Sequence, residues 1–254
     1  MDLKETDILG ENIGNHWYYR SKAKALKRLL GDAAIQNILD VGAGSGFFSK
    51  YLLSVTNAKT ALCVDISYDA EFDDTAAGKP IHYRRSIDTS DDMSDVASDD
   101  TSDADIVLLM DVLEHVDDDI GLLQGYAEKV SKGTLFLISV PAFGFLWSGH
   151  DVYLAHKRRY TLTQVENVVE CAGLTVKSSV YYFGAVFPIA AFLRMSENFF
   201  NGHKQQHKQQ PQSQLKQHCL IVNELLAGLS HMELNLLKYN RLAGLTVFCL
   251  AEVK

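Results

Sequence analysis

The stretch Ile38-Leu-Asp-Val-Gly-Ala-Gly-Ser-Gly-Phe-Phe-Ser-Lys-Tyr-Leu-Leu53 decides the fold. Residues 37–41 form a short apolar run, which predicts a buried strand, and the apolar residues after the glycines recur at helical spacing. Gly42, Gly44 and Gly46 separate the two patterns. Glycine lets a ligand approach the backbone closely, and the first turn of a helix offers free N–H groups to an anion. The stretch therefore predicts a strand, a tight turn and a helix, with a nucleotide-like ligand at the carboxyl end of the strand.

The spacing of the glycines distinguishes between nucleotide ligands. The dinucleotide fingerprint G-x-G-x-x-G would need a glycine at position 47, where Phe47 stands. Asp40 lies two residues before the first glycine, and a second predicted strand, 60–64, ends at Asp65. A carboxylate there can accept both ribose hydroxyls, which fits adenosine and NAD alike. A nicotinamide-dependent oxidoreductase and an ordinary glycine-rich turn both stay open at this point, although Phe47 disfavours the former.

Apolar runs and helical patterns alternate along most of the chain. The polar stretch 68–79, which contains Gly78 and precedes Pro80, predicts a short helix, and longer helices are expected at 117–132 and 163–171. Short links between alternating strands and helices are typical of a doubly wound, mostly parallel α/β sheet. Seven strands are expected, at 37–41, 60–64, 81–84, 105–110, 134–140, 174–180 and 245–252.

Composition and charge narrow the classes of function. Of the 254 residues 47% are hydrophobic, so the chain can bury a substantial core, and the net charge is −8. Eight aspartates and no basic residue lie at 88–105, which predicts a solvated surface segment that lacks the ligand spacing of a calcium loop. Because no basic stripe is present, nucleic acid is not expected as a partner. Four scattered cysteines and the lack of a membrane span or signal sequence predict a cytoplasmic protein.

The pattern Asp40-x-Gly42-x-Gly44-x-Gly46 resembles motif I of the class I S-adenosylmethionine-dependent methyltransferases. The segment Asp111-Val-Leu-Glu-His-Val116, which follows an apolar strand, is similar to the post-strand motif of the same enzymes and is expected to open the next helix. The resemblance implies S-adenosylmethionine as the cofactor and S-adenosylhomocysteine as its product. It also implies the cofactor-binding residues, which are Asp40, Gly42, Ala43, Gly44, Gly46, Asp65, Ile66, Ile87, Asp88, Met110, Asp111 and Val112. Asp88 departs from the family pattern because it opens the run of aspartates.

An amphipathic helix pattern covers 5–30, with its basic residues on the face opposite the apolar one. It contains His16-Trp-Tyr-Tyr-Arg20, which resembles the N-terminal segment of a bacterial group of these methyltransferases found in saccharide and lipid pathways. One interpretation is a lid in which His16 and Trp17 fold over the carboxyl ends of the strands and exclude water. The other is ordinary packing of a helix on the sheet.

The segment after the fifth strand carries the candidate chemistry. Trp147-Ser-x-His150-Asp151-x4-His156-x-Arg158-Arg159-Tyr160 resembles the same bacterial group and leaves the sheet at its ligand-binding edge. A histidine paired with an aspartate can act as a base at neutral pH, so His150 or His156 is expected to be catalytic, with Asp151 as the orienting partner.

Arginine suits a carboxylate or phosphate on the substrate. The residues expected on the substrate side are His16, Trp17, Arg158, Arg159 and Tyr160. The alternative is that the histidine and aspartate only tie the loop together and that the arginines pair with acids such as Glu114. No metal site is expected, because nothing in the spacing of these residues singles one out.

The C-terminal third is expected to build a cap between the sixth and seventh strands. Residues 181–193 are strongly apolar but too short to span a bilayer, so they could line an acceptor pocket or rest on a membrane surface. The Gln/His/Lys-rich tract is expected to be a mobile loop at 201–218. The expected division is an N-terminal lid at 1–36, a cofactor-binding core at 37–180, a helical cap at 181–243 and a final strand at 244–254.

These observations predict a methyltransferase that moves a methyl group by direct displacement to a small-molecule, saccharide or lipid-linked acceptor. Oxygen is the expected accepting atom, because the histidine and aspartate pair is the feature that bears on it. Two rivals stay open, a nicotinamide-dependent oxidoreductase and a methyltransferase-like protein that binds a partner without turnover. The sequence does not indicate an oligomeric state.

Overall fold

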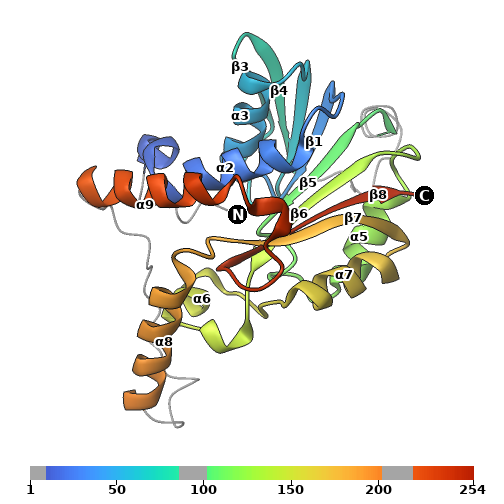
Figure 1. Ribbon diagram of the computed structural model, residues 1–254. Coiled ribbons are helices and arrows are strands. Elements are labelled where there is room, and N and C mark those ends of the chain that lie inside the picture. Colours follow the sequence, from blue (N-terminus) through green and yellow to red (C-terminus); the bar gives the residue numbers. More distant parts are fainter. Residues whose placement is uncertain (1–9, 86–101, 202–219) are drawn as a thin grey trace.

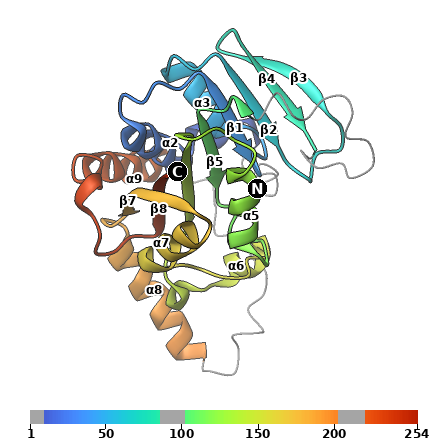
Figure 2. The ribbon, with the colours of Figure 1, turned by 90° about the vertical axis from the view of Figure 1, so that its right-hand side faces the viewer.

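The computed structural model describes residues 10–85, 102–201 and 220–254, which build one sheet with helices on both faces (Figures 1 and 2). The sheet has eight strands in the order β3-β4-β2-β1-β5-β6-β8-β7. The strands are β1 (Asn37–Val41), β2 (Thr60–Val64), β3 (Phe72–Ala76), β4 (Lys79–Arg84), β5 (Ile106–Met110), β6 (Leu135–Pro141), β7 (Leu174–Tyr182) and β8 (Thr246–Val253). The helices are η1 (Gly10–Asn15), α2 (Trp17–Leu30), α3 (Phe47–Val55), α5 (Asp119–Ala127), η2 (Gly144–Leu146), α6 (Gly149–Leu154), α7 (Leu162–Cys171), α8 (Phe187–Asn201), α9 (Leu220–Glu233) and η3 (Leu237–Tyr239).

The centre of the sheet is parallel, which confirms the predicted doubly wound fold. β1 pairs in parallel with β2 on one side and with β5 on the other, and β6 pairs in parallel with β5. Every residue of β5 is buried, because α2, α3 and α9 contribute to the apolar core on one face and α5 and α7 to the core on the other. The chain reverses its direction of winding between β1 and β5. The carboxyl ends of these two strands therefore form the switch point at which such sheets bind ligands.

The sheet has one strand more than the sequence predicts. Residues 68–79, expected as a helix, instead contain β3, which pairs antiparallel with β4. The two-residue turn between them has positive φ at both Ala77 and Gly78, the form that fits the twist of a hairpin. Phe72 stacks on Tyr83 of β4 at 4.3 Å between ring centroids. Glycine at the turn thus ends a strand here, and not a helix.

The N-terminal helix begins later than predicted, after the short helix η1. His16 caps α2 by accepting a hydrogen bond from the backbone N–H of Tyr18. The expected separation of basic and apolar faces is wrong at one position, because Lys22 is completely buried. α9 packs along α2 (Figure 1), and the backbone N–H of Trp17 donates to Asn223 Oδ1 at 2.8 Å. The segment before the first strand and part of the predicted cap therefore form one layer.

The other long helix of the predicted cap, α8, projects away from the sheet (Figure 1). Ile189, Phe192, Leu193 and Met195 are more than half exposed along it. None of the helices in the described part of the chain is both long and apolar enough to span a bilayer. The loop expected at 201–218 lies, apart from Asn201, outside the described residues, as does most of the aspartate-rich segment at 88–105.

Candidate functional site

A cavity of about 230 Å³ opens at the carboxyl ends of the central strands. It is lined by the aromatic start of α2, the turn after β1 and the segments after β5 and β6, together with Phe48 of α3, Arg194 of α8 and residues 245–246 at the start of β8. The sequence-predicted residues on its wall are Trp17, Asp40, Gly42, Ala43, Met110, Asp111, His150, His156 and Arg159. The predicted residues that do not line it are His16, Gly44, Gly46, Asp65, Ile66, Val112, Asp151, Arg158 and Tyr160, while Ile87 and Asp88 lie outside the described residues.

The glycines after β1 are required by the tightness of the turn. Gly42 has φ +67°, and a Cβ atom there would lie 2.7 Å from a methyl group of Val112, so the turn packs directly on the segment after β5. Gly46, with φ +70°, begins α3, and its Cβ atom would lie 2.7 Å from the hydroxyl of Tyr83. Only glycine adopts this backbone freely without a side chain in the way. The turn therefore offers bare backbone to the cavity, as a cofactor site there requires.

Two buried carboxylates flank this turn. Asp65, at the end of β2, accepts hydrogen bonds from the backbone N–H of Gly44 and of Ser67, each at 2.9 Å. Asp40 accepts a hydrogen bond from the Ser49 hydroxyl at 2.7 Å, which ties β1 to α3. These contacts fix the position of Asp65 next to the turn. Its role toward a ribose stays a prediction, and Ile66 beside it is largely exposed.

Asp111 follows β5 in a strained backbone conformation with φ +59°. Its carboxylate accepts hydrogen bonds from the Ser139 hydroxyl and from Nζ of the buried Lys22, whose Nζ also lies 3.3 Å from the Tyr18 hydroxyl. Burial alone would lower the pKa of Lys22, but the charge and hydrogen bond of Asp111, together with Tyr18 and Glu114, outweigh it and raise that pKa above the ordinary value. The sequence analysis missed Lys22. Lys22 lies three and four residues before Ala25 and Leu26, which are buried on the same face of α2, and this spacing could have predicted its burial.

Glu114 and His115 lie in a turn and do not open a helix as the resemblance implies, because α5 begins at Asp119, two residues after the start predicted at 117. Glu114 is completely buried on the cavity wall, and neither of its carboxyl oxygens bonds to another residue in the described ranges. Burial and the neighbouring charge of Asp111 raise the pKa of Glu114 well above its usual range. The His115 ring meets the His156 ring edge to face, with 4.7 Å between the centroids. The wall here thus combines a buried carboxyl group with two imidazoles.

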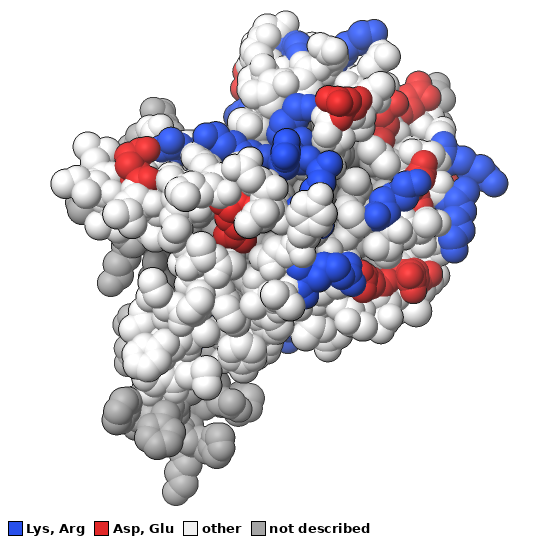
Figure 3. Space-filling view, viewed as in Figure 1, with Lys and Arg blue, Asp and Glu red and all other residues white. Residues whose placement is uncertain are grey.

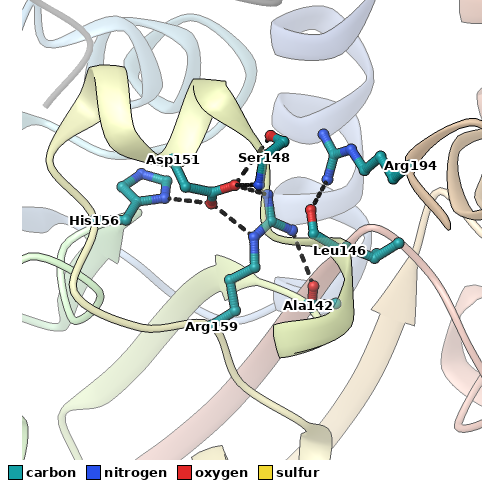
Figure 4. Close-up of polar contacts among 7 residues, drawn as sticks. All are labelled: Ala142, Leu146, Ser148, Asp151, His156, Arg159 and Arg194. Carbon is teal, nitrogen blue, oxygen red and sulfur yellow. Dashed lines mark hydrogen bonds and ion pairs between the residues drawn. The ribbon is translucent and has the colours of Figure 1, made fainter. Parts of the chain in front are cut away.

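Asp151 holds the segment after β6 together (Figure 4). The predicted loop contains a short helix, α6, and Asp151 accepts hydrogen bonds from the backbone and hydroxyl of Ser148 at its start. Its two oxygens also bond Nδ1 of His156, at 2.9 Å, and the Arg159 guanidinium, at 2.6 and 3.0 Å. Burial would raise the pKa of Asp151, but the hydrogen bond from His156 and the charge of Arg159 hold it well below its usual range. Because an ionised carboxylate only accepts, Nδ1 of His156 carries a proton and Nε2 is left as the basic nitrogen.

Both candidate bases lie on the cavity wall, His150 at the start of α6 and His156 after its end. Asp151 bonds to His156, and which of the two histidines acts as a base stays a prediction. Arg159 does not pair with Glu114 but with Asp151, and it also donates to the carbonyl of Ala142. Its guanidinium is therefore engaged within the protein.

Arg158 and Tyr160, which the sequence analysis expects on the substrate side, are engaged with a different acid. Arg158 donates to Asp119 Oδ2 at 3.1 Å and to two backbone carbonyls, and the Tyr160 hydroxyl donates to the same oxygen at 2.8 Å and to the carbonyl of Leu113. The sequence analysis also missed Arg194 of α8, which lines the cavity and donates to the carbonyl of Leu146 at 2.7 Å (Figure 4). It is the residue through which α8 reaches the site.

Comparison with known proteins places this geometry in a family. A family model described as a methyltransferase domain matches residues 15–179, which include the glycine turn, the segment after β5 and His156. No curated protein matches the sequence significantly. The bacterial group suggested by the segments at 16–20 and 147–160 stays a prediction.

Solved structures share the fold at low sequence identity. An S-adenosylmethionine-dependent methyltransferase of Thermotoga maritima is 14% identical with a TM-score of 0.55, over 100% of this chain and 97% of that one. Another, of Archaeoglobus fulgidus, is 16% identical with a TM-score of 0.51, over 98% of both chains. Phosphoethanolamine N-methyltransferase 2 of Haemonchus contortus, in complex with S-adenosylmethionine, is 15% identical with a TM-score of 0.54, over 98% of this chain and 55% of that one. These matches favour neither the oxidoreductase nor the non-catalytic alternative. The chain belongs to the class I methyltransferases, enzymes that use S-adenosylmethionine as their cofactor.

Proposed function

We propose that the enzyme methylates an oxygen atom of a small-molecule, saccharide or lipid-linked acceptor, with His156 as the residue that faces the accepting hydroxyl. One observation carries this proposal: His156 is held by Asp151 on the wall of the same cavity that the glycine turn and Asp111 line. A hydroxyl must lose its proton, and a histidine whose second nitrogen is fixed by a carboxylate is suited to take it.

The cofactor is assigned to the side of the cavity formed by the ends of β1, β2 and β5. The bare turn of Gly42 and Ala43, with Met110 and Asp111 opposite, suits the methionine part, and Asp65 suits the ribose hydroxyls. The remaining assignments, Ile87 and Asp88 for adenine, rest on the family resemblance alone. S-adenosylmethionine supplies a methyl group on a sulfonium, and the group passes to the acceptor oxygen as the carbon–sulfur bond breaks with its electron pair on sulfur. The proton of the hydroxyl passes to Nε2 of His156.

The start of α2 is assigned the role of a lid. Trp17, Tyr18 and Tyr19 line the cavity, and Trp17 and Tyr18 pack on Phe183 at the end of β7. Aromatic side chains at this position exclude water, which would otherwise compete for the methyl group and solvate the nucleophile. His16 lies just outside the cavity wall, so we assign it to the capping of α2.

The exposed side of α8 supports a lipid-linked acceptor over a freely diffusing one. Phe187 at the start of the helix packs on Phe145 of η2, with 6.3 Å between the ring centroids, and Arg194 of the same helix lines the cavity. In Figure 3 the described part of this projection shows no charged residue on the face in view. Such a surface fits contact with a membrane that carries the acceptor.

The proposal is tested by methyl transfer from labelled S-adenosylmethionine to three acceptor classes: phenols, saccharides, and polar lipids in vesicles, each with an amine of the same class beside it. We expect product with hydroxyl acceptors, and a fall in kcat of about 100-fold or more for His156→Gln with unchanged affinity for S-adenosylhomocysteine. His150→Gln is the matched variant on the same wall, with a smaller expected loss. Methylation of the amines alone would overturn oxygen as the accepting atom, and an unchanged kcat of His156→Gln would overturn the role of His156.

A further inference from the structure

Glu114, His115 and His156 form a cluster of potential metal ligands on the cavity wall. Each offers one ligand atom, and the three atoms all lie within 4.8 Å of one another. All three residues line the cavity, so a fourth ligand could reach an ion held between them. Metal–ligand distances of about 2.0–2.2 Å would bring the atoms to roughly 3.4 Å apart around a tetrahedral ion.

Glu114 is a buried carboxylate of this wall with no paired cation among the described residues. Asp111, on the same wall, pairs with Lys22, and Asp151, which holds His156, pairs with Arg159. The described residues provide no ion pair to Glu114, and neither of its oxygens accepts a hydrogen bond from another of them. A carboxyl group that is fully buried without a partner is costly for the fold. An ion bound between Glu114 and the two imidazoles would supply the missing partner.

His156 is oriented as metal-binding histidines are. Its Nδ1 donates to Asp151, which fixes the ring and leaves Nε2 as the ligating atom, and Figure 4 shows that this second nitrogen points away from Asp151. Metal-ligating histidines commonly donate their other N–H to a carboxylate in this way, which raises the basicity of the ligand. Arg159 and Ser148 both donate hydrogen bonds to Asp151, so the carboxylate that orients the His156 ring is itself held in place.

We propose that Glu114, His115 and His156 bind a divalent transition-metal ion of the Zn²⁺ type, whose open position faces the cavity. One carboxylate and two imidazoles suit Zn²⁺ and its neighbours in the first transition row, whereas Mg²⁺ and Ca²⁺ prefer oxygen ligands. The role of the ion rests on the proposed function, methyl transfer to a hydroxyl, and differs from it in the base: the ion coordinates the acceptor oxygen and makes its proton more acidic. In that state Nε2 of His156 is a ligand and not the base, so the proton passes to solvent. The coordinated oxygen then attacks the methyl carbon, and the electron pair of the broken bond stays on sulfur.

The test uses the full chain, treated with a chelator and titrated with Zn²⁺ by calorimetry and with Co²⁺ by visible absorption. We expect one ion per chain, and at least tenfold weaker binding by Glu114→Gln and by His156→Ala. His82→Ala, an exposed histidine on β4, is the matched control with unchanged affinity. A second control replaces His203, His207 and His218 together by alanine, because a histidine-rich tract can hold metal by itself. Binding of S-adenosylhomocysteine by every variant confirms that it is folded.

Four outcomes decide the inference. Loss of binding in Glu114→Gln and His156→Ala alone supports it, and no binding, or binding lost in either control, overturns it. Methyl transfer to hydroxyl acceptors that is unchanged by the chelator overturns the ion's role while the proposed function stands. Specific metal binding without any methyl transfer to oxygen supports the site and overturns the proposed acceptor.

Discussion

Two buried ionic clusters border the cavity, and they differ in how far apart their members lie in the chain. Lys22 pairs with Asp111 across 89 residues, so this contact joins the N-terminal helix to the end of β5. Asp151, in contrast, bonds residues three, five and eight positions away. The local cluster orients a single side chain, His156. The long-range pair ties α2, the proposed lid, to the sheet beside the proposed cofactor site.

The largest effect is expected for Asp151→Ala. This variant leaves the Arg159 guanidinium buried without its carboxylate, and removes the partner of His156 as well. Breaking a buried ion pair by removing one partner costs about 3–5 kcal/mol. We expect a loss of this size in the free energy of unfolding, measured as a shift of the urea midpoint at constant slope. The milder Asp151→Asn is expected to stay folded, with lower kcat and unchanged affinity for S-adenosylhomocysteine.

An exposed pair of the same geometry provides the control. Asp117 pairs with Lys157 at 2.6 Å, the same N–O distance as between Arg159 and Asp151, but its side chain is 89% exposed. Exposed ion pairs contribute little to stability, so Asp117→Ala is expected to leave the urea midpoint unchanged. Equal losses in Asp117→Ala and Asp151→Ala would contradict the view that burial decides the strength of these clusters.

An intermediate effect is expected for Lys22→Met, which keeps the length of the side chain and removes its charge. Asp111 keeps its bond from Ser139 and is about a quarter exposed, so its lost partner is replaced in part by water. We expect a loss of about 2 kcal/mol in stability, because a charged acceptor loses its buried donor. Affinity for S-adenosylhomocysteine should fall about tenfold, because Asp111 borders the assigned cofactor site.

Lys22→Met and Asp151→Asn are expected to differ in which quantity they change. Lys22→Met lowers the affinity for S-adenosylhomocysteine, whereas Asp151→Asn keeps that affinity and lowers kcat. Lys24→Met, on the exposed face of the same helix, is the matched control for calorimetric measurement of the affinity. If Lys22→Met binds S-adenosylhomocysteine as tightly as the wild type does, the long-range pair serves stability alone.

The fold could be predicted from the sequence wherever periodicity decides. Apolar runs such as the one that forms β5 have no other stable place than the middle of a parallel sheet, and the order of strands and helices then follows. The hairpin of β3 and β4 could not be found in this way. Its turn places Ala77, a residue that rarely adopts positive φ, beside Gly78, and the ring stacking that stabilises the pair joins different strands.

The candidate site, like the fold, could be predicted from the sequence only in part. The contact of Asp151 with His156 could be anticipated, because the two residues lie close together in one segment. The burial of Lys22 could be anticipated from its spacing, but its partner could not, because Asp111 lies far along the chain. Glu114 could not be assigned without the structure, since its isolation depends on what surrounds it. Residue types that stand out in a motif are not always those that face the cavity, as Arg158 and Tyr160 illustrate.

The smallest effect is expected for Tyr160→Phe. This variant tests whether a buried hydrogen bond from a neutral group stabilises the fold less than the two charged clusters do. The Tyr160 hydroxyl is buried and donates to Asp119 and to the carbonyl of Leu113, but it carries no charge. The hydroxyl has one proton, which Asp119 and the Leu113 carbonyl share, and Asp119 keeps its ion pair with Arg158, so about one hydrogen bond is lost and no charge is left alone. We expect a loss of about 1 kcal/mol in stability and no change in KM for the acceptor, measured by urea unfolding and by steady-state kinetics. A rise in KM without loss of stability would show that the hydroxyl touches the substrate, and it would return Tyr160 to the substrate side of the site.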